Sequence, residues 1–307
     1  MSGRHYDNVY YHFFMDALKR NPSLDVSYFP TGKIFDAKQL KNRFDIILLW
    51  ENNTYGMPTE INNIETLGVP IIAKAADASQ AKKSIPFHKK WKIDYYFHFN
   101  PSEYFYELYP RNFNYKTIFI GIEPSLYRNL TPFKTRIKDR ILNSGNIGST
   151  KFLSQVINKI KNPKWNALRQ YRLRTMCTKL PYVDYTSTLQ HEYVNDNYPL
   201  MLQKYAAGIA ACTFQPVIKF WEIPAAGCLT FLEVTGKNRS NLLGFEDYET
   251  AIFINEKNYK EKFEEYLSDY DNPKWEKIAN NGRNFALNNF NNDAAVNSLV
   301  DLIKNLV

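Results

Sequence analysis

A lysine and a glutamate three residues apart could bind the two polar ends of a nucleotide. They are Lys219 and Glu222, in the stretch VIKFWEIPAAGCLTFLEV at residues 217–234. If residues 217–226 are helical, positions i and i+3 share a face, so both side chains project together. A lysine near a helix start strengthens the positive end of the dipole and favours an anion. The glutamate can accept hydrogen bonds from two neighbouring hydroxyls, so the pair fits the pyrophosphate and ribose of a nucleotide.

The same stretch has a simpler interpretation. Pro224 would cost about 3 kcal/mol inside a helix, so we expect the helix to start near Ile223 or to be kinked there. A lysine and a glutamate at this spacing also form ordinary surface ion pairs, which contribute only a few tenths of a kcal/mol. Spacing alone leaves both interpretations open.

A glycine-containing loop at residues 144–149, SGNIGS, is a second candidate. Gly145 and Gly148 permit positive φ and a close approach of the backbone to a ligand. A loop of this kind that opens a helix can bind phosphate through its N–H groups. Glycines at strand ends are also common in ordinary turns.

Polar residues follow predicted strands in the first half of the chain. Asp77 comes just after the strand that ends at Lys74, where open α/β sheets place their ligands. It is our first candidate for a base that deprotonates an acceptor hydroxyl, although it could equally cap the following helix. His98, at the next strand's end, is the second candidate or a buried structural histidine. Glu51 is a third.

Residues 79–92, SQAKKSIPFHKKWK, combine five lysines with two aromatic residues. One interpretation is contact with an anionic surface, such as membrane headgroups, a lipid phosphate or nucleic acid. The other is a solvated helix face with an aromatic edge in the core. The lysines are Lys82, Lys83, Lys89, Lys90 and Lys92.

These residues must be positioned by alternating strands and helices. Apolar runs at 45–50, 69–73, 94–99, 117–121, 141–145, 209–214, 228–234 and 251–254 predict strands, and polar periodic stretches between them predict helices. Expected helices include 7–20, 149–169, 197–207, 258–268, 272–289 and 292–306. Continuous apolar strands indicate parallel sheets covered on both faces.

The proline-containing segment 122–140 suggests two α/β domains, 1–130 and 131–307. The first opens on a helix, so either its first strand is absent or the natural chain starts earlier.

The stretch KFWEIPAAGC at residues 219–228 resembles a signature of GT-B glycosyltransferases, Arg/Lys-x-x-Glu-x-x-Ala-x-Gly, in their group-1-like, spore-maturation-protein-like branch. Further segments follow in the order that family has them: the 144–149 loop, the helix near 198–205, the strand at 209–214, and residues 244–247 and 280–284. The likeness covers residues 117–303 and the N-terminal half only in outline. The order of these segments is more specific than any one motif.

The resemblance implies two Rossmann-like domains that face each other across a cleft, with the last helix bracing the first domain. The acceptor would bind to the N-terminal domain, where Asp77 and His98 are the catalytic candidates, and the nucleotide-sugar to the C-terminal one. Glu222 would bind the ribose, Lys219 and the glycine loop the diphosphate, and the region near Tyr185 the base. The residues expected to bind the donor are Gly145, Asn146, Gly148, Ser149, Lys151, Tyr185, Lys219, Glu222, Ala226 and Gly227. Many group-1 enzymes carry another glutamate eight residues earlier; here that position is Phe214.

We therefore expect a hexosyltransferase-type enzyme that moves a sugar from a nucleotide-sugar to a hydroxyl of a polysaccharide, lipid-linked or other glycan, with no metal and no other cofactor. Asp269-Tyr-Asp271 fits the D-x-D pattern of metal-dependent transferases, but it lies in a polar turn between two predicted helices. The alternatives are a glycosyltransferase that modifies nucleic acid and a non-catalytic nucleotide- or sugar-binding protein of the same fold. Fold alone decides neither.

Composition limits the class of protein further. The 307 residues carry a net charge of +8, mostly in the N-terminal half, which favours an anionic partner. Three cysteines without metal-type spacing indicate buried thiols in a reducing compartment. We see no signal peptide and no apolar run of the roughly 20 residues that a membrane span needs. The expectation is a cytoplasmic protein, with the lysine-rich segment as a candidate contact to the inner face of a membrane.

Overall fold

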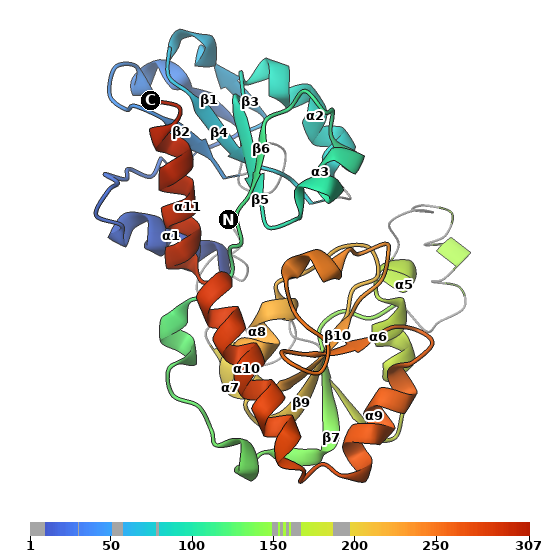
Figure 1. Ribbon diagram of the computed structural model, residues 1–307. Helices are drawn as coiled ribbons and strands as arrows, with labels where there is room; N and C mark the ends of the chain where they lie inside the picture. The colour runs from blue at the N-terminus through green and yellow to red at the C-terminus, as the bar shows by residue number, and fades with distance from the viewer. Residues whose placement is uncertain are drawn as a thin grey trace. The chain divides into compact units, whose positions relative to one another are not determined.

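The computed structural model describes residues 10–29, 31–50, 58–77, 80–148, 153, 156, 157, 160, 167–186 and 197–307. The described chain forms two compact units (Figure 1). Of the described residues, the first comprises Phe14–Ile120 and Asp293–Val307, and the second comprises Gly121–Asn292 together with residues 10–13. Compared with the expected division at residue 130, residues 121–130 group with the second unit and the chain's last segment groups with the first.

The first unit is built on a four-stranded parallel sheet with the order β2-β4-β5-β6. Its strands are β2 (Ile47–Leu49), β4 (Ile71–Lys74), β5 (Tyr95–His98) and β6 (Tyr115–Thr117). A separate parallel pair joins β1 (Ile34–Asp36) to β3 (Glu60–Asn62). The helices are α1 (Tyr10–Arg20), α2 (Ala81–Lys90), α3 (Ser102–Leu108) and most of α11 (Asn292–Lys304), with short 3-10 turns at η1 (Ala37–Leu40) and η2 (Ile64–Thr66).

The side chains of β5 show that both faces of this sheet are covered. Tyr96 and Phe97 are both fully buried, yet successive side chains of a strand point to opposite faces. The Tyr96 ring packs near Phe105 of α3, at a centroid distance of 6.0 Å. The Phe97 ring packs near Phe14 of α1, at 6.2 Å. The continuous apolar run therefore serves two layers of helices, as the sequence predicted.

The second unit has a five-stranded, all-parallel sheet with the order β11-β10-β9-β7-β8. Its strands are β7 (Ile137–Ser144), β8 (Val183–Thr186), β9 (Tyr205–Ala210), β10 (Leu229–Glu233) and β11 (Ile252–Ile254). Its helices are α5 (Ala167–Gln170), α6 (Arg172–Cys177), α7 (Tyr198–Leu202), α8 (Lys219–Ala225), α9 (Tyr259–Ser268) and α10 (Pro273–Asn289). Short 3-10 turns lie at η3 (Pro124–Tyr127), η4 (Phe133–Thr135) and η6 (Ser240–Leu243).

Small residues let α8 lie close to this sheet. A Cβ at Gly208 of β9 would come within 3.0 Å of Ile223 of α8. A Cβ at Gly282 of α10 would come within 2.2 Å of the Thr250 carbonyl oxygen. Figure 1 shows α8 and α10 on one side of the sheet and α6 and α9 on the other. The sheet therefore fixes α8, and with it Lys219 and Glu222, against the end of β9.

The last helix packs within the first unit. Within that unit the Arg20 Nε lies 2.7 Å from the Asp293 carboxylate, and the Lys116 ammonium donates to the Ser298 carbonyl at 2.9 Å. These contacts agree with the expectation that the C-terminal helix braces the N-terminal domain. None of the described helices is long and apolar enough to cross a membrane.

Two expected elements differ from the structure. The predicted helix 197–207 ends as α7 at Leu202, and its last residues form the start of β9. Ala206, Ala207 and Ala210 are fully buried in this strand, where only small side chains fit between the covering helices. The predicted strand 117–121 is shifted, because the ladder with β5 uses Tyr115–Thr117. Most of the predicted helix 149–169 lies outside the described residues.

Candidate functional site

The helix α8 presents both residues of the central pair. It begins at Lys219 and includes Pro224 in its last turn. Of the two alternatives that the sequence left, a start near Ile223 is therefore wrong, and a kink at that point stays a prediction. A proline there removes one hydrogen bond close to the helix end, where fewer bonds depend on it. Lys219 and Glu222 are both half-buried, one turn apart. Among the described residues, no hydrogen-bond donor reaches the Glu222 carboxylate.

The Lys219 ammonium is held at the carboxyl end of β7. It donates to the Tyr198 hydroxyl at 2.7 Å and lies 3.5 Å from the Ser144 hydroxyl. The two hydroxyls are themselves 2.7 Å apart. The ammonium also lies 4.2 Å from the centre of the Tyr198 ring, a cation–π contact. One lysine, one tyrosine and one serine from three separate elements therefore fix a positive charge beside the glycine loop.

Burial controls the protonation of this pair. It lowers the pKa of Lys219 below its ordinary value, and the attraction of Glu222 opposes that shift. Burial likewise raises the pKa of Glu222, and the attraction of Lys219 opposes it. The pKa of Tyr198 is raised by burial and then by Glu222, so its hydroxyl stays protonated. An anion beside Lys219 and hydroxyl donors beside Glu222 would each favour the charged form.

The glycine loop follows β7, and contacts with neighbouring residues hold its backbone in place. Gly145 has φ of 102°, which favours glycine. The Gly148 N–H donates to the Thr175 hydroxyl at 2.8 Å, and a Cβ at Gly148 would meet the Leu168 backbone at 2.6 Å. The buried Arg174 donates to the Asn146 carbonyl at 2.9 Å. The loop backbone is therefore pinned from two sides.

The other expected donor residues are found in different places. Asn146 is exposed in the loop, and Tyr185 of β8 is 40% exposed beside Asn143 of β7 in the strand register. Ser149 and Lys151 lie outside the described residues.

Ala226 and Gly227 are buried at the C-terminal end of α8. Gly227 has φ of 72°, a left-handed helix cap, and the carbonyls of both residues accept from Arg136 at 3.0 Å. In the structure these two residues hold the end of the helix and do not line a surface.

Sequence reasoning missed Tyr198, Arg174 and Glu233. Glu233 ends β10 and is 1% exposed. Burial raises its pKa to about 7, and the attraction of Arg174 opposes the shift. The one signal in the sequence is a glutamate that closes an apolar strand, at the sheet edge where α/β folds bind ligands. Arg174 and Tyr198 are distant in the chain from the residues they hold, so no local pattern marks them.

Asp77 and His98 come together in the first unit. The His98 Nε2 lies 4.0 Å from the Asp77 carboxylate. The histidine is buried, whereas the aspartate side chain is 57% exposed. The Asn100 backbone N–H donates to His98 Nδ1 at 3.3 Å. Burial, and then the nearby Lys74, hold the pKa of His98 well below its usual value, so the ring is neutral. Glu51 lies outside the described residues.

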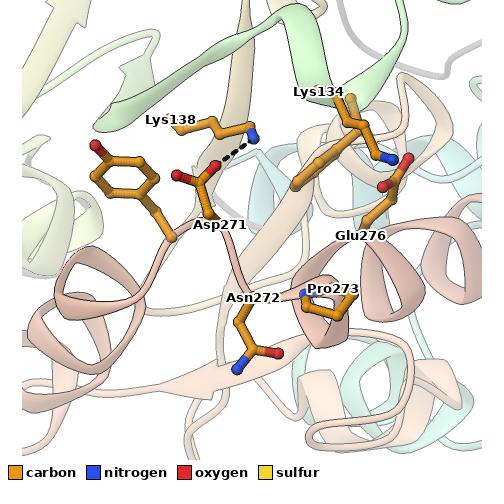
Figure 2. Close-up of a pocket in the computed structure, with 8 residues that line it drawn as sticks. Lys134, Lys138, Asp271, Asn272, Pro273 and Glu276 are labelled. Atoms are coloured by element: carbon orange, nitrogen blue, oxygen red, sulfur yellow. Dashed lines mark hydrogen bonds and ion pairs between the residues drawn. The ribbon is translucent and has the colours of Figure 1, made fainter.

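The D-x-D pattern lies in a turn between α9 and α10, as the sequence indicated. There the Asp271 carboxylate binds Lys138 at 2.6 Å. Both residues line a surface hollow of about 290 Å³. Figure 2 shows this pair on one side of the hollow and Lys134 and Glu276 on the other. Within the described ranges, no group of three or more His, Cys, Asp or Glu could hold a metal ion.

Comparisons with known proteins identify the fold. Searches with protein-family models and among curated proteins find no match. Among solved structures, Anabaena HepE in complex with UDP-glucose has a TM-score of 0.54 at 12% identity, with 85% of this chain and 79% of that chain covered. Sucrose-phosphate synthase from Thermosynechococcus elongatus has a TM-score of 0.54 at 12% identity, with 88% and 75% covered. A variant of S. aureus TarM in complex with UDP has a TM-score of 0.53 at 10% identity, with 87% and 57% covered.

These similar structures are glycosyltransferases of the GT-B type, so the chain has the α/β fold with parallel sheets that the sequence indicated. At this level of identity the likeness concerns the fold. The spore-maturation-like branch stays a prediction.

Proposed function

We propose that this protein is a glycosyltransferase that moves a sugar from a nucleotide-sugar to a hydroxyl group. The observation that supports it most is the half-buried pair on α8, in which Glu222 presents a carboxylate without a hydrogen-bond donor among the described residues. This pair lies at the carboxyl edge of a parallel sheet, where such folds bind nucleotides. The solved relatives HepE and TarM contain UDP or UDP-glucose, which makes a UDP-sugar the first donor to test.

In this proposal, three groups of residues bind the ribose, the diphosphate and the base of the nucleotide. Glu222 accepts hydrogen bonds from the ribose hydroxyls, and Lys219 neutralises the diphosphate together with N–H groups of the glycine loop. Tyr185 offers an exposed aromatic surface to the base. When the bond between the sugar and the diphosphate breaks, negative charge develops on the departing oxygen. A fixed ammonium stabilises that charge without reorganisation, which is why we propose transfer without a metal.

The acceptor side of the proposal is the pair Asp77 and His98. Because His98 Nδ1 accepts the Asn100 N–H, the proton of the neutral ring sits on Nε2, the nitrogen nearest Asp77. A ring in that state donates at Nε2 and cannot take up a proton there. We therefore assign the base to Asp77, which removes the proton of the attacking hydroxyl, and a positioning role to His98.

Release of nucleoside diphosphate from a panel of UDP-, GDP- and ADP-sugars tests this function, with a mixture of simple glycosides as acceptors. We expect release from donors of one base, and its loss in Glu222→Gln. Glu256→Gln, a half-buried glutamate that binds Arg172 at 3.1 Å, is the matched control. Binding of a nucleotide without release in the parent would instead favour a non-catalytic binding protein.

The acceptor side has its own test. Asp77→Asn should lose transfer at least 100-fold and keep nucleotide binding, because the two sites lie in different units. His98→Gln, which retains an N–H near the Nε2 position, should keep more activity than His98→Leu. Full activity in Asp77→Asn would exclude Asp77 as the base.

A further inference from the structure

We propose that the exposed lysine face of α2 binds the anionic surface of a membrane. This face consists of Lys82, Lys83, Lys89 and Lys90, all of which are exposed. At 3.6 residues per turn, the four side chains fall within an arc of about 120°. The helix contains no acidic residue, and its buried residues lie on the opposite side. The lysines therefore share one face of the helix, as two pairs on either side of the exposed Pro86.

The helix under this face is fixed firmly to the first unit. Ala81 and the C-cap residue Trp91 are 1% and 0% exposed. The Ser84 hydroxyl lies 2.9 Å from the Tyr109 hydroxyl, and the His88 ring stacks on Phe113 at 3.7 Å. Because the buried side is held by packing and a hydrogen bond, the helix presents the four lysines on a backbone that is fixed to the first unit.

The charge of this face is not neutralised from within. Among the described residues, no carboxylate forms an ion pair with any of the four lysines or with Lys92. Closely spaced like charges repel, so an array of this kind is best stabilised by an external anion.

The chemistry of the face favours lipid headgroups over nucleic acid. Proteins that bind single strands stack bases on exposed aromatic side chains, but Trp91 is fully buried and Phe87 is half-buried. Base edges of a duplex are read by Arg or Lys at guanine and by Asn or Gln at adenine, and of these residues α2 presents lysine alone. Lysine ammonium groups are point charges that suit a diffuse anionic surface, to which each adds a similar increment of attraction. The expected association is peripheral and sensitive to salt.

Co-sedimentation with vesicles tests the proposal. The parent should bind vesicles of phosphatidylcholine with 30% phosphatidylglycerol, fail to bind pure phosphatidylcholine, and detach in high salt. Replacing the four lysines of the face by glutamine should weaken binding about 100-fold or more. The matched control replaces four exposed lysines elsewhere, Lys257, Lys260, Lys277 and Lys304, and so makes the same change in net charge. Circular dichroism establishes that both variants fold.

Two outcomes would overturn the proposal. If both quadruple variants lose binding equally, total charge and not this face is responsible. If the parent binds a 20-base oligonucleotide, single- or double-stranded, much more tightly than it binds the anionic vesicles, and the α2 variant loses that binding, the partner is nucleic acid. Neither result bears on the donor site, which lies in the other unit.

Discussion

Replacement of Glu233 by glutamine is expected to stabilise the second unit at pH 8 and to change little at pH 4. Glu233 is 1% exposed at the end of β10, and burial raises its pKa from 4.5 to about 7. Below pH 4.5 the carboxyl group is protonated in the folded and the unfolded chain, so it does not favour either state. As the pH rises toward 7, the unfolded chain ionises first, which lowers its free energy relative to that of the folded chain.

The size of the effect follows from that shift. A difference of one pKa unit corresponds to about 1.4 kcal/mol, so a shift of between two and three units destabilises the folded state by about 3 kcal/mol above pH 7. Glutamine resembles the protonated carboxyl group and does not titrate. The variant should therefore unfold at a temperature roughly 6–12 °C above the parent at pH 8.

Urea denaturation at pH 4, 6 and 8, followed by circular dichroism, measures the difference. Glu249→Gln, at an exposed glutamate of the same unit, serves as the control for the loss of one carboxylate. If the effect of Glu233→Gln does not change with pH, the carboxyl group has the same pKa in the folded and the unfolded chain. The attraction of Arg174 would then offset burial, and our reasoning would be refuted.

Three further variants probe how the site is held. Gly282→Ala places a methyl group within 2.2 Å of the Thr250 carbonyl and should lower the free energy of unfolding by about 2 kcal/mol or more in urea; an unchanged midpoint would contradict this packing. Arg136→Met leaves the Ala226 carbonyl at the end of α8 without its donor and should cost about 1–3 kcal/mol by the same assay. Tyr198→Phe removes the hydroxyl that binds the site lysine and should weaken nucleotide binding about tenfold by calorimetry, because the ammonium is then less well fixed.

The sequence was most informative where a segment had only one reasonable fold. The apolar runs that became β2, β4, β5, β10 and β11 were located to within a few residues, since buried parallel strands read as continuous apolar stretches. The alanine-rich β9 read partly as a helix, because alanine is a good helix former and its place in the sheet is decided by packing. The three-residue strands β1 and β3 leave no clear periodic signal.

The candidate site was predictable to the extent that it is local. Lys219 and Glu222 share one turn of helix, so their spacing alone indicated that they lie together. Tyr198 and Arg174 reach the site from other elements, and their roles depend on tertiary contacts that no short pattern encodes. Asp77 and His98 fall between these cases: strand ends of one parallel sheet predict proximity, but the proton on Nε2 follows only from the Asn100 hydrogen bond.

The most direct test of the donor site compares the binding of nucleotides that contain ribose with the binding of nucleotides that contain dideoxyribose. Binding of UDP, GDP and ADP, and of their 2′,3′-dideoxy counterparts, is measured by calorimetry for the parent and for Glu222→Ala. We predict that one nucleotide binds the parent and that loss of its two hydroxyls weakens binding roughly 10- to 100-fold, whereas the variant binds both forms equally weakly. If the parent does not distinguish the two forms, or the variant still does, Glu222 does not bind the ribose and the proposed donor site is wrong.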